Sequence, residues 1–404
     1  MPVTCPIRFA RLTEDEMRVL DREIMGHAFA THTALGRLCD ESITEFAQDG
    51  PMTSDSLDLG QEDLRQKDSS GNLAVPNLSV LRPHLLCVMA ALLTVCAHAA
   101  PVTALAFAPD GTALVSNGDR RLDVRSVKDA AFHRSIVCEL PKITGIAFAP
   151  HGRLLAVAGG EPGVRGELRL LSWPDGRELH RLDGPADLFT SIAFNHDGTR
   201  FGAASAGHTA LIWNLDGAAA PAVLFTLTGH AAPVLAIAFS PSGKTIATAG
   251  ADRALKIWSA VDGGLLRSLG YHTEAIHAIA FRPGAADVPV TCATAADDRT
   301  VRIWQPEIGR MVRIIRGHEG SVFALAWSAD GSTLFTAGRE GILRHLDGGS
   351  DTILSRQAIS TDWIYSLALS PDGATLATGD WSGTVRLYSA TALKSQSQPG
   401  KESP

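Results

Sequence analysis

The sequence predicts an all-β fold, a seven-bladed β-propeller of four-stranded antiparallel blades with a helical or disordered N-terminal extension. Three observations predict it. One phrase, an apolar run followed by a turn, occurs seven times between residues 102 and 373. The apolar anchors of its copies are 41 to 46 residues apart, which matches the period of propeller blades. The chain of 404 residues contains 38 glycines, which indicates many tight turns.

Each copy of the phrase ends in a glycine and carries one large apolar anchor. The copies are Val102–Gly111, Ile143–Gly152, Phe189–Gly198, Val234–Gly243, Ile276–Gly284, Val322–Gly331 and Ile364–Gly373. The anchors are Phe107, Phe148, Phe194, Phe239, Phe281, Trp327 and Leu369.

The fourth copy shows why the pattern predicts one blade. The run Val234–Phe239 is apolar on both faces, as in a strand buried on both sides. A turn then leads to a second apolar run, Thr245–Ala249, and Leu255–Trp258 alternates like a strand with one inward face. The more polar run Leu265–Leu269 is expected to form the outer edge.

These residues resemble the WD-repeat family over about residues 98–389. The resemblance implies a network of His, Ser/Thr, Asp and Trp in a complete blade, tying the outer loop to the strands. The fourth blade has His230, Thr248, Asp252 and Trp258, and the fifth has His272, Thr294, Asp298 and Trp304.

Other blades depart from this pattern, so the network is expected in two blades, in part in the sixth, and not elsewhere. The sixth keeps His318 and Thr336, with Glu340 for Asp and Leu346 for Trp. At the same positions the third blade has Pro185, Gly207 and Trp213, the seventh has Ser360, Ser382 and Tyr388, and blades one and two retain little beyond His98.

Charge and cysteine usage exclude some classes of function. The formal net charge is −7, and most of it lies before residue 100. The nearly neutral repeats lack a basic stripe, which argues against nucleic acid or an anionic membrane as partner. The six cysteines fit no CxxC spacing, and Cys138 and Cys292 are expected to be buried thiols.

The chain outside the repeats divides into four segments. Residues 1–48 are expected to be helical, and 11–48 faintly resemble the start of the bacterial GxxExxY family, which is thought to be nuclease-like. Residues 49–81 are polar and predict a disordered linker. The propeller is expected over 100–389 and a disordered tail over 390–404.

Two interpretations compete for residues 82–99. Arg82, the apolar run Leu85–Val95 and the small residues Ala97-His-Ala99 resemble a secretory signal peptide, and the run is too short for a membrane span. Alternatively, the segment supplies an outer strand that closes the last blade. The first interpretation predicts export to the periplasm, and the second is compatible with a cytoplasmic protein.

The sequence contains no pattern that indicates catalysis. It lacks HExxH and GxSxG motifs, and the first strands are almost entirely apolar or hydroxylic, with Lys142 and His277 as exceptions. No catalytic residue, metal or cofactor is predicted. The expected function is a non-catalytic scaffold for a protein or peptide partner; the alternative is a secreted propeller that binds a small ligand or acts as an enzyme in its central channel.

The contact surface is expected on the face formed by the loops before the first strands and the turns between second and third strands. Asp187, Glu274, Glu319, Asp362, Trp363, Trp381, Arg339 and Glu340 are the candidate contact residues. Two exposed tryptophans beside charges are typical of a binding hot spot. The alternative is that one or both tryptophans pack against a neighbouring blade and replace its missing network.

Overall fold

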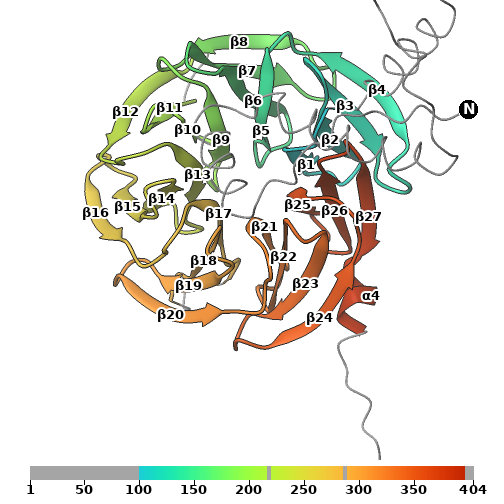
Figure 1. The fold of residues 1–404 in the computed structure, drawn as a ribbon. Coiled ribbons are helices and arrows are strands. Elements are labelled where there is room, and N and C mark those ends of the chain that lie inside the picture. The colour runs from blue at the N-terminus through green and yellow to red at the C-terminus, as the bar shows by residue number, and fades with distance from the viewer. Residues whose placement is uncertain (1–99, 216–219, 285–288, 396–404) are drawn as a thin grey trace, which may run out of the picture. The chain divides into compact units, whose positions relative to one another are not determined.

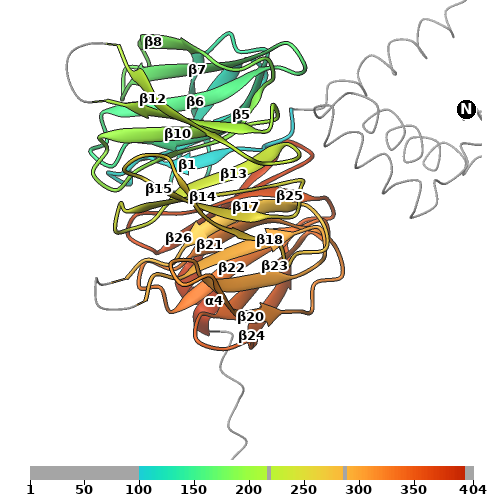
Figure 2. The same cartoon turned by 90° about the vertical axis from the view of Figure 1, so that its left-hand side faces the viewer.

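The computed structural model describes residues 100–215, 220–284 and 289–395. Within these residues, seven antiparallel sheets follow one another around a central axis (Figure 1), and Figure 2 shows the ring from the side. We number the sheets blades 1 to 7 in chain order. The predicted seven-bladed propeller is confirmed.

Each blade pairs its strands in chain order, from the axis outward. The innermost strands are β1 (Leu105–Phe107), β5 (Lys142–Phe148), β9 (Phe189–Phe194), β13 (Val234–Phe239), β17 (Ile276–Phe281), β21 (Val322–Trp327) and β25 (Ile364–Leu369). The second strands are β2 (Ala113–Asn117), β6 (Leu154–Glu161), β10 (Arg200–Ser205), β14 (Thr245–Gly250), β18 (Cys292–Ala296), β22 (Thr333–Gly338) and β26 (Thr375–Asp380).

The third and outermost strands complete the blades. The third strands are β3 (Arg121–Ser126), β7 (Arg165–Ser172), β11 (Thr209–Asn214), β15 (Leu255–Ser259), β19 (Val301–Gln305), β23 (Ile342–Asp347) and β27 (Val385–Ser389). The outermost strands are β4 (Phe132–Val137), β8 (Glu178–Asp183), β12 (Ala222–Thr228), β16 (Leu265–Leu269), β20 (Arg310–Ile315) and β24 (Ile353–Ala358). Among the described residues, blade 7 has three strands.

The end of the chain differs from the prediction. Residues 390–395, expected to begin a disordered tail, form helix α4 (Ala390–Ser395), which contacts β24, β26 and β27. Ala390 and Leu393 are buried in the core between blades 6 and 7. The helix is ordered because these two apolar side chains, three residues apart, lie on one face and cover an apolar surface. The predictions for 1–48, 49–81, 82–99 and the rest of the tail fall outside the described residues.

Each pair of neighbouring blades shares one apolar core. Seven clusters of buried side chains fill the seven inter-blade spaces, for example Phe239, Ile246 and Trp258 of blade 4 against Ile212 and Leu227 of blade 3. A sheet face is buried only when another layer covers it. No blade is therefore a folding unit by itself, and the core of the protein is distributed around the ring.

Blades 1 and 7 close the ring. Val102, Leu105 and Phe107 of blade 1 pack with Ala377 of blade 7. The Val102 amide donates to the carbonyl oxygen of Asp380 at 3.0 Å, and the Ser366 hydroxyl donates to the carbonyl oxygen of Val102 at 2.9 Å. The first and last repeats are joined by the same combination of apolar packing and hydrogen bonds as their neighbours.

Arginines of the second and outermost strands add polar links between blades. Arg200 Nη1 of blade 3 donates to the Ala260 carbonyl oxygen of blade 4 at 2.5 Å. Arg267 Nε of blade 4 donates to the Glu307 carbonyl oxygen of blade 5 at 3.0 Å. The acceptors lie in or beside the turns that precede the outermost strands, so these turns are tied to the blade before them.

Blade 3, in which the sequence predicts no His, Thr, Asp and Trp network, has aromatic packing around Trp213. Phe189 is fully buried and lies 5.8 Å from the Trp213 ring, between ring centroids. Trp213 also stacks on Phe201 at 5.1 Å. A Cβ at Gly184 would lie 2.3 Å from the Phe189 ring, so a glycine in the loop leaves the space that the ring occupies.

We predict that Gly184→Ala destabilises the protein by about 2 kcal/mol, because the added methyl group overpacks the Phe189 ring. Chemical denaturation monitored by circular dichroism measures the change. Gly270→Ala is the matched control, since a Cβ there meets nothing within 4 Å, and its expected effect is below about 0.5 kcal/mol. Equal effects of the two substitutions would contradict the packing explanation.

Candidate functional site

The loops before the first strands and the turns between second and third strands meet at one end of each blade. In blade 3 Asp187 Oδ1 accepts from the Gly163 amide in the turn of blade 2 at 2.9 Å. In blade 6 the Arg339 amide donates to the Ser321 carbonyl oxygen, and in blade 7 the Trp381 amide donates to that of Trp363, each at 2.9 Å. We call this end the loop face. It is the face on which the sequence placed the candidate contacts.

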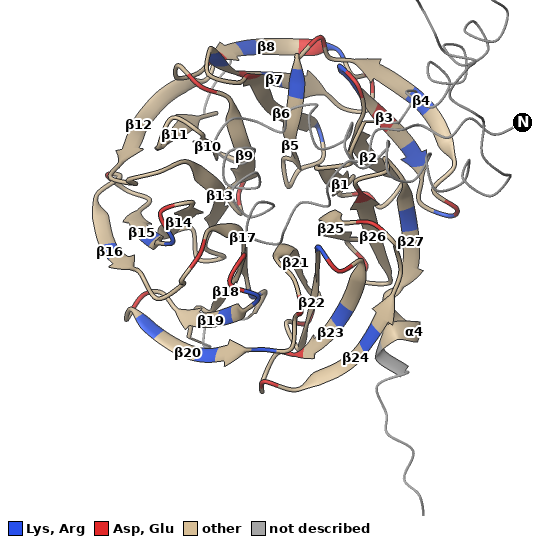
Figure 3. Cartoon of the chain, in the orientation of Figure 1, with Lys and Arg blue, Asp and Glu red and all other residues tan. Residues whose placement is uncertain are grey.

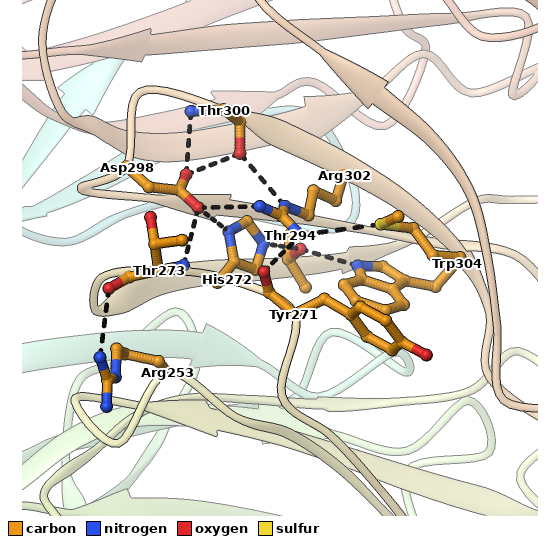
Figure 4. A network of polar contacts seen from close by, with 10 residues as sticks. Arg253, Tyr271, His272, Thr273, Thr294, Asp298, Thr300, Arg302 and Trp304 are labelled. Atoms are coloured by element: carbon orange, nitrogen blue, oxygen red, sulfur yellow. Dashed lines mark hydrogen bonds and ion pairs between the residues drawn. The ribbon is translucent and has the colours of Figure 1, made fainter.

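In blade 5 the four expected side chains lie in one chain of hydrogen bonds (Figure 4). His272 contacts Asp298 through Nδ1 and Thr294 through Nε2, both at 2.7 Å, and Trp304 Nε1 donates to Thr294 Oγ1 at 2.8 Å. Arg302, which the sequence did not single out, adds an ion pair to Asp298 Oδ2 at 3.3 Å. The loop is thereby tied to two strands.

Blade 4 repeats the arrangement with the residues that the sequence indicated. His230 contacts Asp252 Oδ2 at 2.9 Å and Thr248 Oγ1 at 2.7 Å, and Trp258 Nε1 donates to the same threonine oxygen at 2.7 Å. His230, Thr248 and Trp258 are buried. The ring nitrogens of His230 and Trp258 and the hydroxyl of Thr248 all form hydrogen bonds within the blade. These residues therefore support the loop face and are not its contact surface.

The carboxylate and the imidazole of blade 5 have opposed surroundings. Burial alone would raise the pKa of Asp298, but hydrogen bonds from His272 and Thr300 outweigh it and hold this pKa at about 2. Burial lowers the pKa of the His272 imidazole by more than Asp298 raises it. The pair therefore favours a neutral imidazole beside an ionised carboxylate.

Blade 6 forms the network in part. His318 Nε2 contacts Thr336 Oγ1 at 2.9 Å. Glu340 accepts from the amides of Glu319 and Gly320 at 2.5 and 2.9 Å and pairs with Arg344 at 2.5 Å. His318 Nδ1 is buried and lacks a hydrogen-bond partner among the described residues. The longer glutamate reaches the loop backbone but leaves the imidazole half satisfied.

Blade 7 builds its network around a residue that the sequence did not indicate. Asp380 is buried and accepts from the hydroxyls of Ser360 and Ser382 at 3.1 and 2.6 Å, and from the Thr384 amide at 2.9 Å. Arg386 pairs with it. Asp380 stands where blades 4 and 6 have glycine at the end of the second strand. An acid at that repeat position was the available signal.

Blades 1 and 2 also have their own polar centres. Asn117 Oδ1 accepts from the Thr103 and Ala104 amides at 2.9 and 3.0 Å. In blade 2 the buried Glu167 pairs with Arg169, and with Arg181 at 2.6 Å. The loops of blades 1 and 4 to 7 are thus tied by polar side chains whose composition differs between blades, whereas Glu167 of blade 2 links the third and outermost strands.

The two candidate tryptophans lie in a cluster of aromatic rings. Phe323, Trp363, Tyr365 and Trp381 contact one another with ring centroids 5.0 to 6.3 Å apart. We call these four residues the aromatic arc. All four are partly exposed, so the tryptophans are packed on neighbouring rings and also reach the surface. Each of the two interpretations that the sequence left open describes part of this arrangement.

A β-bulge in the innermost strand places Phe323 and Tyr365. The register of β21 shifts between Val322 and Ala324, and that of β25 between Ile364 and Ser366. Bulges redirect side chains, so the residue inside each bulge leaves the alternation of its strand. The residues at this position in blades 2 to 7 are Thr144, Thr190, Leu235, His277, Phe323 and Tyr365. Aromatic rings thus occupy consecutive bulges in blades 5 to 7.

The threonines at this position are used inside the ring. Thr144 Oγ1 donates to the Phe189 carbonyl oxygen at 2.5 Å, and Thr190 Oγ1 to that of Val234 at 2.6 Å. His277 instead lies 5.1 Å from the Phe323 ring and contacts Asp297 Oδ1 at 2.8 Å. The bulge residue is therefore aromatic in blades 5 to 7, and it is aliphatic or carries a hydroxyl group in blades 2 to 4.

The remaining candidate contacts differ in position. Arg339 lies over the Trp363 ring, 5.0 Å from its centroid, and Asp362 immediately precedes Trp363, so both adjoin the arc. Glu319 is exposed, and Glu340 is half-buried. Glu274 belongs to the loop of blade 5. Asp187 lies in blade 3 and accepts from the Gly163 and Leu188 amides, so it supports a loop away from the arc.

The innermost strands present alanine at a second shared position. The alanines are Ala106, Ala147, Ala193, Ala238, Ala280, Ala326 and Ala368, one in each blade and all partly exposed. Methyl groups neither donate nor accept protons. Among the described residues, no group of three or more His, Cys, Asp or Glu side chains is arranged to hold a metal ion. Within the same residues, no helix has the length and hydropathy of a membrane span.

Comparison with known proteins identifies the repeats. The chain matches the family model described as WD domain, G-beta repeat, at residues 90–124, 176–214, 222–259, 263–305, 309–347 and 353–389. The chain belongs to the WD-repeat family. The matched segments leave out most of blade 2, whose polar centre is Glu167.

One curated WD-repeat relative is of bacterial origin. The WD-repeat chain is 31% identical over 98 residues to the "Uncharacterized WD repeat-containing protein sll1491" of Synechocystis sp.. The match covers 24% of this chain and 27% of that protein. The similarity therefore concerns about two repeats of each protein and does not extend over either whole chain. Neither comparison bears on the likeness of residues 11–48 to the GxxExxY family.

We predict that Asp380→Ala destabilises the WD-repeat propeller by about 3 kcal/mol, because it leaves a partly buried guanidinium and two hydroxyls without their acceptor. Chemical denaturation measures the loss. Asp351→Ala, in an exposed turn, is the control, with an expected change below about 0.5 kcal/mol. A loss for Asp380→Ala no larger than that of the control would show that blade 7 does not depend on this carboxylate.

The buried His318 predicts a pH dependence of stability. Burial and the nearby Arg344 lower the pKa of this imidazole from 6.5 to about 4. Because the folded-state pKa is depressed, the unfolded chain binds the proton first. The contribution of the neutral imidazole to the free energy of unfolding is fully present above pH 6.5 and is lost as the pH drops towards 4. The contribution of His318 to this loss is about 3 kcal/mol.

Denaturation of the wild-type protein and His318→Gln at pH 7.0, 5.5 and 4.0 measures this contribution. The variant is expected to lose less stability than the wild type over this range, because glutamine does not titrate. Parallel curves for the two proteins would contradict the assignment to His318.

Proposed function

We propose that this WD-repeat propeller is a non-catalytic platform that binds a protein or peptide partner on its loop face, with the aromatic arc as the main contact. The observation that carries the proposal is the gathering of four partly exposed aromatic rings in blades 6 and 7. At the bulge position of blades 2 to 4, the chain has threonine or leucine instead.

Aromatic side chains suit this role for two physical reasons. They bury a large area on binding and dominate the energetics of many interfaces. The rings of the arc also fix one another, since Phe323 and Tyr365 are stacked at 5.0 Å with 8° between their planes. Side chains held in place before binding lose little conformational entropy when the partner arrives.

The polar groups beside the arc supply orientation. Arg339 lies on Trp363, and the His277–Asp297 pair adjoins Phe323. Burial would raise the pKa of Asp297, but His277, Ser321 and Arg339 outweigh it and lower this pKa. A guanidinium and an ionised carboxylate next to an apolar centre give an interface a preferred direction.

The lining of the innermost strands supports a role without catalysis. General acid–base and nucleophilic catalysis need titratable or nucleophilic side chains within hydrogen-bond reach of a substrate. The seven alanines of the innermost strands offer neither. Enzymatic use of the central channel, the alternative that the sequence left open, would depend on the few titratable residues of these strands, such as Lys142 and His277.

Partner capture tests this proposal. We predict that Trp381→Ala weakens retention of the native partner by at least about tenfold, because it removes one of the four rings of the contact. Purified wild-type and variant chains serve as bait in a lysate of the source organism, with quantification by mass spectrometry. Ile308→Ser, at an exposed apolar position of blade 5, is the control and is expected to retain the partner.

Melting temperatures separate binding from packing. Trp381→Ala is expected to melt within a few degrees of the wild type, because the ring is only partly buried. A variant that keeps the partner but melts at a clearly lower temperature would contradict the proposal and assign the arc to inter-blade packing.

A further inference from the structure

The outer rim of the propeller contains one strand that differs from its counterparts. Six outermost strands are described, and each pairs with its own blade on the inner side. Five of them contain at least one arginine, at Arg134, Arg181, Arg267, Arg310, Arg313 and Arg356. The sixth, β12 of blade 3, reads Ala-Val-Leu-Phe-Thr-Leu-Thr and has no charged side chain.

Charge on an edge strand is a device against unwanted pairing. An edge presents backbone N–H and C=O groups to any extended chain that approaches, and charged side chains oppose such an approach. All six outermost strands also contain a β-bulge near their start, which serves the same purpose. In β12 the bulge at Leu224 is followed by the regular segment Phe225–Thr228 without a charge.

The surface beside β12 is apolar. Val223 and Leu224 of β12 are 50% and 42% exposed. In blade 4, Val261 is 81% exposed, and Leu265 and Leu266 are 48% and 53% exposed. The turn of blade 4 between Val261 and Leu265 packs beside β12, because a Cβ at Gly263 would lie 2.7 Å from the Phe225 ring, next to Leu224 in the chain. β12 and β16 follow each other along the rim in Figure 1, and Figure 2 views this side.

We propose that β12 is a strand-addition site, at which a short, uncharged, extended segment of a partner protein pairs with the outer edge of blade 3, which no other described strand pairs with. Its alternate apolar side chains would lie on Val223, Leu224 and the blade 4 group. This surface is on the rim, so the inference is independent of the aromatic arc and of the function proposed for it.

The size of the apolar surface favours a segment over a second copy of the chain. The five side chains expose on the order of 400 Å², which is in the range of the largest apolar patch of a typical monomer, a patch that is often functional. A stable interface between globular partners buries roughly 800 Å² on each side. A strand of five to seven residues needs less, because main-chain hydrogen bonds supply much of its affinity and side-chain pockets supply specificity.

A synthetic peptide tests the edge directly. The probe is the β12 sequence Ala-Val-Leu-Phe-Thr-Leu-Thr with two lysines at each end for solubility, since a strand can pair with its own sequence. Hydrogen exchange of the full chain, with and without probe, is expected to show at least threefold slower exchange in Ala222–Thr228 and little change in the other outermost strands. A control probe in which glutamate replaces the third residue, leucine, and the fourth residue, phenylalanine, is expected to have no effect on exchange.

Two matched variants decide the assignment. Thr226→Lys gives the exposed edge of β12 a charge, as the other described outermost strands have. It is expected to weaken probe binding at least tenfold, measured by fluorescence polarisation. Gln357→Lys adds a charge to β24, one residue beyond the position that corresponds to Thr226, and is expected to leave binding unchanged. Both positions are exposed, so neither change should unfold the protein, and circular dichroism checks this.

Three results would overturn the inference. They are equal protection of all outermost strands, equal affinity of the Thr226→Lys variant, and no protection of β12 at millimolar probe. Self-association of the chain that Thr226→Lys abolishes, detected by analytical ultracentrifugation, would instead identify a second copy as the occupant and would also overturn the proposal of a partner segment.

Discussion

A blade of this protein has two apolar faces, and neither can be buried within the blade itself. Burial is provided by the neighbours, which is why the seven cores lie between blades. The energy of apolar burial is proportional to the area removed from water, so stability depends on closing the ring. The packing of Val102, Leu105 and Phe107 on blade 7 is therefore as important as any contact within a repeat.

Once the ring supplies burial, the polar networks of the loop face are free to vary. Blades 4 and 5 use the His, Thr, Asp and Trp network, blade 7 uses Asp380, and blade 1 uses Asn117. Blade 3 fills the same region with Phe189 and Trp213. The common requirement is that the loop be tied to its strands without leaving buried polar groups unsatisfied. His318 Nδ1 is a local departure from it.

The rigid ring also determines where recognition is possible. The innermost strands run side by side (Figure 1), so equivalent bulges bring residues of successive blades together. Phe323 and Tyr365 stack because they occupy the same bulge in neighbouring blades. In Figure 3 the charged residues are distributed over both loops and rim, with β12 tan along its whole length. The loop face and the rim of blade 3 are thus chemically different surfaces of one scaffold.

The sequence by itself determined the number of blades, the four strands of blade 4 and the two complete networks. It did so because a repeat aligned on itself shows which positions are equivalent, and equivalent positions have equivalent environments. In blade 4 the expected runs agree with β13 to β16 to within one residue. Trp363 and Trp381 were found in the same way, from their places in the loop and turn of the last repeat.

Only the tertiary structure decided the partners of residues that break the repeat. Asp380 and Glu167 became acceptors because folding brought donors to them from the loop, the turn or an adjacent strand. Phe323 and Tyr365 joined the aromatic arc because a bulge shifted them out of strand alternation, and a bulge depends on pairing between strands. The order of α4 likewise depends on an apolar surface built from blades 6 and 7. Local periodicity predicts elements, whereas contacts between blades exist only once the ring has formed.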